Sequence, residues 1–165
     1  MTSSGFHCQD YWIDGIAWSY GYIGVLEPVY ILQKKALKLM TFRGRRDNVD
    51  DVFRELCIMN IYQLCIFSSL ILAKKILTGL TSLKSVNLQQ IGHGHNTRGL
   101  ERHDFSINTV NNNFGRHHFC FIVAKLWRSL PSDLTDPSLS LSNFRRLLKR
   151  HVLLLDIETI QDFWS

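Results

Sequence analysis

The chain has 165 residues, a formal net charge of +5 at pH 7 and a hydrophobic content of 45%. This length gives room for one modest domain, and the apolar content is sufficient to bury a core, so the composition argues against a disordered chain. The excess of positive charge indicates an anionic partner.

The cysteine content and the amino terminus both favour an intracellular protein, nuclear or cytoplasmic. The amino terminus lacks the basic start and the apolar run of a secretory signal. The cysteines are widely spaced, so we expect free and mostly buried thiols in a reducing compartment. They are Cys8, Cys57, Cys65 and Cys120.

The first concentration of positive charge follows an acidic stretch. Residues 1–33 contain three acids and no Lys or Arg, whereas residues 34–46 contain six basic residues and no acid. Residues 28–40 predict a helix with Pro28 near its first turn, whose lysines lie opposite an apolar face. That face consists of Val29, Leu32, Ala36, Leu39 and Met40. The six basic residues are Lys34, Lys35, Lys38, Arg43, Arg45 and Arg46.

The next segments predict a basic loop and then apolar helices. The loop spans residues 41–48, and residues 47–51 provide a capping start for the following helix. Residues 53–80 are strongly apolar and predict a short helix and a longer one, with a break near Met59 and Asn60.

Part of this apolar segment approaches the length of a membrane span. Residues 56–73 are apolar except for Asn60, Gln63, Ser68 and Ser69, and a span needs about 20 residues. The four polar side chains favour a buried or partner-facing helix instead. A small membrane-associated protein anchored by this segment is the alternative.

The second half of the chain begins with a loop-rich stretch and ends with a clear helix. Residues 83–113 lack a helical stripe and predict loop with short extended pieces, and the periodicity of residues 114–130 fits strand or helix. Residues 141–155 predict an amphipathic helix that is capped by Ser140. Its apolar stripe is Leu141, Phe144, Leu148, Val152 and Leu155. The second basic cluster lies off that stripe, at Arg145, Arg146, Lys149 and Arg150.

Signs of catalytic or metal chemistry are weak. The only Asp-Asp pair, Asp50 and Asp51, stands where a helix starts, and capping and dipole stabilisation are its natural roles. The histidines lack the spacing of a zinc site, and no nucleophile signature or Gly-rich phosphate loop is present. We therefore expect no catalytic residue, no metal and no cofactor. The histidines and the cysteine considered for zinc are His93, His95, His117, His118 and Cys120.

Several short motifs nevertheless occur in a meaningful order. They are LQKKALKLMTF at residues 32–42, FRELCIMNIYQL at 53–64, HNTR at 95–98, LWRSLP at 126–131 and FRRLLK at 144–149. In this order they resemble the carboxyl-terminal end of the reverse transcriptases of non-LTR retrotransposons. The resemblance covers about residues 10–152, with Arg128 in place of the Asn in the W-N-S-L-P element of that family.

The resemblance implies a fold and an organisation. It favours helix over strand for residues 114–130, with the end at Pro131, and therefore a mainly α fold: a small irregular helical domain with a loop-rich middle segment. It divides the chain into a helical thumb-like region at residues 1–82, a linker at 83–113 and a carboxyl-terminal helical region at 114–165. The palm carboxylates that bind the catalytic metals lie upstream of this region in the family, so the resemblance implies a non-catalytic fragment.

The expected function is RNA or DNA binding through phosphate contacts, without sequence preference. The ten basic residues of the two clusters are the expected contact residues, with the six of residues 34–46 as the main contacts and the four of residues 145–150 as lesser ones. The missing polymerase body is a second expected partner, and a membrane is not expected. A decayed gene product with no selected function is the remaining alternative.

Overall fold

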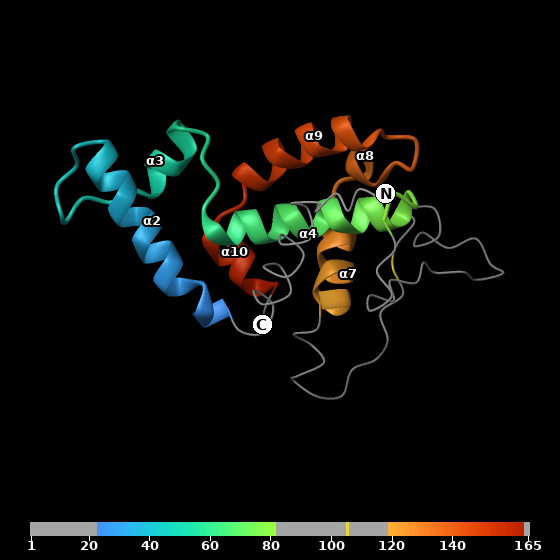
Figure 1. The fold of residues 1–165 in the computed structure, drawn as a ribbon, viewed down its shortest axis with the longest axis horizontal. Helices are drawn as coiled ribbons and strands as arrows, with labels where there is room; N and C mark the ends of the chain where they lie inside the picture. Colours follow the sequence, from blue (N-terminus) through green and yellow to red (C-terminus); the bar gives the residue numbers. More distant parts are fainter. Residues whose placement is uncertain (1–22, 82–104, 106–118, 164–165) are drawn as a thin grey trace, which may run out of the picture.

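The computed structural model describes residues 23–81, 105 and 119–163. These parts are mainly helical, which confirms the predicted fold class (Figure 1). The helices are η1 (Ile23–Val25), α2 (Glu27–Met40), α3 (Asp50–Glu55), α4 (Ile61–Leu77), α7 (Phe119–Ser129), α8 (Ser132–Thr135), α9 (Leu141–Leu153) and α10 (Ile157–Asp162). The predicted loop at 83–113 lies outside the described residues except for Phe105.

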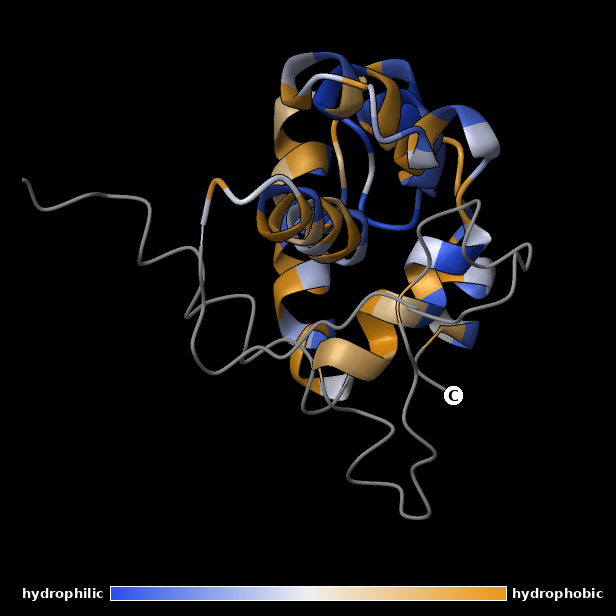
Figure 2. Cartoon of the chain, turned by 90° about the vertical axis from the view of Figure 1, so that its right-hand side faces the viewer, coloured by the Kyte–Doolittle hydropathy of each residue, from blue (hydrophilic) through white to orange (hydrophobic). Residues whose placement is uncertain are grey.

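Helix α4 is the centre of the fold. It is apolar on most of its circumference, as expected for a helix buried on several sides. In Figure 1 it runs between α9 on one side and α7 with α10 on the other, and it also packs against α2. The described parts of residues 1–82 and 114–165 therefore share one hydrophobic core. Figure 2 shows apolar and polar positions alternating along the same helices.

The predicted break near Met59 and Asn60 is confirmed, because α3 ends at Glu55 and α4 begins at Ile61. Asn60 is the N-cap of α4, and its side chain accepts a hydrogen bond from the backbone N–H of Gln63 at 2.9 Å. The Gln63 side chain accepts one from the N–H of Asn60 at 3.0 Å, which completes a capping box. The Gln63 amide also donates to the carbonyls of Val152 and Leu155, and so connects the start of α4 to the end of α9.

Helix α9 begins where it was predicted, at Leu141, and ends at Leu153, two residues before the predicted end. Ser140 caps α9, accepting a hydrogen bond from the N–H of Asn143 at 3.3 Å. The predicted stripe faces the core: its three central residues are fully buried and its two end residues are half-buried. Trp127 of α7 packs there against Phe144, with ring centroids 5.9 Å apart, and against Phe105, at 5.3 Å.

The predicted orientation of α2 is wrong. The apolar face expected to pack inward is exposed, with Leu32 62% and Leu39 79% accessible, and the buried residues are Tyr30 and Leu37. Tyr30 decides the orientation because its ring contacts Phe53 and Tyr62, at centroid distances of 6.0 and 5.3 Å, while its hydroxyl keeps a hydrogen-bond partner.

The apolar segment 56–73 is not one continuous helix, because the turn and extended residues between α3 and α4 interrupt it. Among the described residues, no helix combines the length and the apolar character needed to cross a bilayer. The expectation of mostly buried thiols holds for Cys65 but not for Cys57, which is exposed at the end of α3; Cys120 is half-buried. Cys8 lies outside the described residues.

Candidate nucleic-acid interface

The ten predicted contact residues belong to two surfaces. The first, here called the α2 cluster, contains Lys34, Lys35, Lys38, Arg43, Arg45 and Arg46, on α2 and the loop that follows it. The second, here called the α9 face, contains Arg145, Arg146, Lys149 and Arg150. The two surfaces differ in how many of their cations form ion pairs or hydrogen bonds with other groups of the protein.

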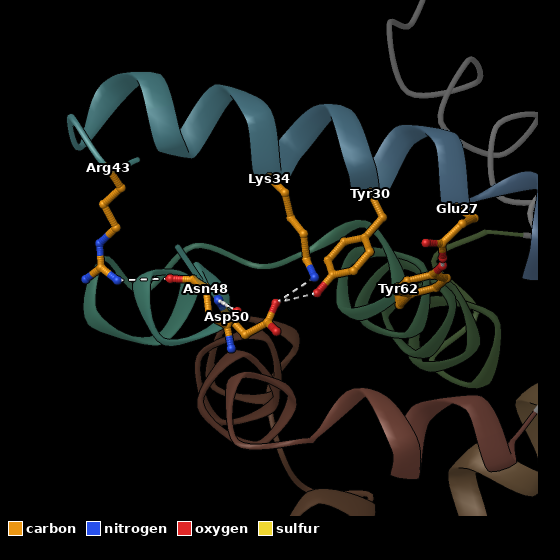
Figure 3. Close-up of polar contacts among 7 residues, drawn as sticks. All are labelled: Glu27, Tyr30, Lys34, Arg43, Asn48, Asp50 and Tyr62. Carbon is orange, nitrogen blue, oxygen red and sulfur yellow. Dashed lines mark hydrogen bonds and ion pairs between the residues drawn. The ribbon is translucent and has the colours of Figure 1, made fainter. Parts of the chain in front are cut away.

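Lys34 forms an ion pair with a carboxylate of the protein itself. Its Nζ lies 3.0 Å from Oδ1 of Asp50 and 4.4 Å from the centroid of the Tyr30 ring, and the Tyr30 hydroxyl donates to the same carboxylate oxygen (Figure 3). Burial tends to raise the pKa of Asp50, but the hydrogen bonds from Tyr30 and Lys34 and the charge of Lys34 lower it below its ordinary value. Lys34 thus neutralises a partly exposed carboxylate of the protein itself.

Lys38 and Arg43 brace the loop that connects α2 to α3. Nζ of Lys38 donates to the carbonyl of Arg45 at 2.6 Å, and the guanidinium of Arg43 donates to the carbonyl of Asn48 at 3.0 Å. Arg43 also lies 3.8 Å from the carboxylate of Glu55. These contacts leave Lys35, Arg45 and Arg46 as the exposed cations of the α2 cluster that have no ion pair among the described residues.

All four cations of the α9 face are exposed, and none has an ion pair in the part of the chain that the structure describes. Helix α9 contains no acid, and its burial on one side directs the four side chains to solvent. Arg145 and Lys149, and likewise Arg146 and Arg150, are four residues apart, about 6 Å along the helix axis. Two parallel rows of positive charge result.

Internal contacts do not offset the repulsion within these rows. Like charges four residues apart destabilise a helix by roughly 0.2–0.5 kcal/mol per pair. Only the residues near the carboxyl end, such as Arg150, gain from the helix dipole. Burial lowers the pKa of the neighbouring His151 below its ordinary value of 6.5, so this side chain does not add to the positive charge near pH 7. An anionic ligand would remove the repulsion.

The Asp-Asp pair stands at the start of α3, as the sequence predicted. The cap differs in detail: Val49 is the N-cap without a side-chain bond, and the side-chain oxygen of Asn48 accepts from the N–H of Asp50 at 3.0 Å. Asp50 also borders a pocket of about 40 Å³ between α3 and the α9–α10 corner. That volume suits ordered water and is too small for a nucleotide.

The histidines considered for zinc lie outside the described residues, and Cys120 is half-buried on α7. Within the described ranges, no group of three or more His, Cys, Asp or Glu side chains is arranged to hold a metal ion. The guanidinium of Arg128 donates to the carbonyl of Phe105 at 3.2 Å.

The sequence did not predict that three residues of the α2 cluster contact groups of the protein itself. They are Lys34, Lys38 and Arg43, and their contacts form only when α2 and the loop after it take up their places beside α3. The exposure of Phe42 beside that cluster was not predicted either.

The chain matches no protein-family model, no curated protein and no solved structure.

Proposed function

We propose that this chain binds RNA or DNA through phosphate contacts and that the α9 face is the principal contact surface. The observation that carries the proposal is the arrangement of four exposed cations on one helix that contains no acid and forms no ion pair among the described residues. Lys and Arg side chains in this arrangement neutralise successive phosphates and release condensed counterions.

The binding is independent of sequence, because phosphate contacts position a protein without reading bases. We expect dissociation constants of about 10⁻⁴ to 10⁻⁶ M at physiological salt. Lys35, Arg45 and Arg46 extend the contact at the end of α2. Lys34, Lys38 and Arg43 contribute less than the sequence suggested, since each is already bound within the protein.

We further propose that the chain corresponds to the thumb-side and carboxyl-terminal part of a non-LTR retrotransposon reverse transcriptase. The ordered motifs support this relation, and the helical fold is compatible with it. The exposed apolar face of α2 supports a contact with the polymerase body of such an enzyme, since an apolar helix face that the described residues leave uncovered is a common protein-interaction surface.

Fluorescence anisotropy with labelled RNA and DNA tests the nucleic-acid proposal. The variant in which all four residues of the α9 face become Gln should bind more weakly, to a similar degree for different sequences. Replacing Arg145, Arg146 and Arg150 by Lys keeps the charge and should keep the affinity. Lys125→Gln is the control for position, because Lys125 lies on α7, across α4 from α9 (Figure 1). Unchanged affinity in the Gln variant would contradict the proposal.

A further inference from the structure

Phe42 is the most exposed large apolar residue of the described chain. Its side chain is 96% accessible, whereas every other phenylalanine in the described ranges is buried or half-buried. It lies directly after α2, in the loop that carries Arg43, Arg45 and Arg46, at the end of the molecule farthest from α7 (Figure 1). An aromatic ring is thus presented to solvent among positive charges.

The backbone of Phe42 is strained. Its φ is +53°, in the left-handed region that disfavours residues with a Cβ. The N–H of Arg43 donates to the carbonyl of Lys38 at 3.0 Å, the bond that closes a helix with a Schellman turn. Helix α4 ends in the same way, with a bond from Leu80 to the carbonyl of Lys75, and there the left-handed position is Gly79. At the end of α2 a phenylalanine occupies the place that favours glycine.

The fold gains no packing from this ring, because almost all of its surface is in solvent. The loop around it is held in place by its own contacts. In addition to the bonds from Lys38 and Arg43, the N–H of Gly44 donates to the carboxylate of Asp47 at 2.7 Å. A ring on a braced loop loses little conformational freedom when it meets a ligand.

We propose that Phe42 is a stacking platform for an unpaired base, and that the chain therefore prefers single-stranded over double-stranded nucleic acid. The inference rests on the proposed function and names its substrate class. Aromatic side chains stack on exposed bases without regard to sequence, whereas the bases of a duplex are already stacked on one another. Arg45 and Arg46, exposed in the same loop, neutralise the phosphates on either side of the stacked base.

Three substitutions of Phe42 test the proposal with a single-stranded oligonucleotide and a duplex of equal length. Phe42→Leu keeps an apolar side chain and removes the aromatic face, and Phe42→Gly also removes the backbone strain. Both should weaken single-strand binding by about tenfold, as expected for the loss of one stacked base, and should leave duplex binding unchanged. Phe42→Trp should retain the affinity, with quenching of the added indole fluorescence on binding. Leu80→Ala is the control, because Leu80 is an exposed apolar residue in the corresponding turn after α4, and this variant should bind like the wild type.

Thermal unfolding separates a binding defect from a folding defect, because Phe42→Gly should raise the melting temperature while it weakens binding. Unchanged single-strand affinity in Phe42→Leu, or an equal loss for both nucleic acids, would overturn the stacking role. Binding of the wild type to vesicles of anionic lipid that is lost in Phe42→Gly, with no change in single-strand affinity, would assign the ring to a membrane surface and would also overturn it. Failure of the wild type to bind either nucleic acid would instead refute the proposed function itself.

Discussion

The hydroxyl of Tyr30 donates a hydrogen bond to Oδ1 of Asp50 across 2.8 Å, and this contact fixes how α2 lies on α3. The two residues are 20 positions apart in the sequence. Their contact turns one side of α2 inward and leaves the side with Leu32 and Leu39 in solvent. It also places Asp50 within reach of Lys34, so the charge of that lysine is paired within the protein. One buried tyrosine thus decides which part of the α2 cluster can meet a ligand.

The stability of the protein should fall steeply above pH 10. Burial raises the pKa of Tyr30 and of Tyr62 above the ordinary value of 10.0, and a hydrogen bond to a carboxylate raises each further. Tyr30 donates to Asp50, and Tyr62 donates to Glu27. A raised folded-state pKa gives stability that is complete below the unfolded-state pKa and is lost as the pH rises above it. The Tyr30→Phe/Tyr62→Phe double variant should lose less stability between neutral pH and pH above 10. Urea unfolding over that range measures this, and equal losses in both proteins would contradict it.

The capping box of α4 should contribute measurably to stability. Asn60→Ala leaves a buried N–H of α4 without its partner, and we expect a loss of about 1 kcal/mol or more in the free energy of unfolding. Ser140→Ala is the matched control, because the cap of α9 is exposed and its bond is longer, at 3.3 Å. Its loss should be smaller. A larger effect at Ser140 would show that the capping box is not a main support of the core.

Removing the charge of Lys74 should stabilise the protein at neutral pH. Lys74 is only 2% exposed, and its Nζ donates to the carbonyl of Asp136 at 3.0 Å. Burial lowers its pKa, so the charged form opposes folding and the penalty fades as the pH rises towards 10.5. Lys74→Met keeps the aliphatic stem, and we expect a gain of about 1 kcal/mol at pH 7 that shrinks at alkaline pH. A variant less stable than the wild type at pH 7 would show that the bond to Asp136 outweighs the burial of charge.

Purified protein with a primed template, nucleotides and magnesium should give no primer extension. The reaction needs paired carboxylates free to bind two metal ions, whereas Asp50 is bound to Tyr30 and Lys34 at a helix start. Gel analysis of the extension products tests this. Incorporation that disappears in Asp50→Ala would assign a catalytic role to the pair.

The sequence predicted the elements more successfully than their orientation. Helix α9 was predictable because its apolar residues form one narrow stripe, and the core position of Phe144 is confirmed for the same reason. Helix α2 has apolar residues on two sides, with Tyr30 and Leu37 on one and Leu32 on the other. Periodicity then predicts a helix but does not determine which side is buried.

The candidate site was predictable only in composition. Local sequence identified both basic clusters, but the engagement of Lys34 and Arg43 depends on contacts with Asp50 and Asn48 that arise when the loop closes. The exposure of Phe42 follows from the left-handed backbone after α2, where the sequence offers no glycine as a signal. Tertiary contacts, rather than local pattern, separate the free cations from the bound ones.

The salt dependence of nucleic-acid affinity tests the central claim most directly. Each phosphate contact contributes a slope of about −0.9 for duplex DNA, or about −0.7 for single strands, to log affinity against log salt. Replacing Arg145, Arg146, Lys149 and Arg150 by Gln should therefore flatten the slope by about 3 and reduce the affinity uniformly across sequences. A slope that stays at the wild-type value in this variant would contradict the account, because the α9 face would then contact no phosphates.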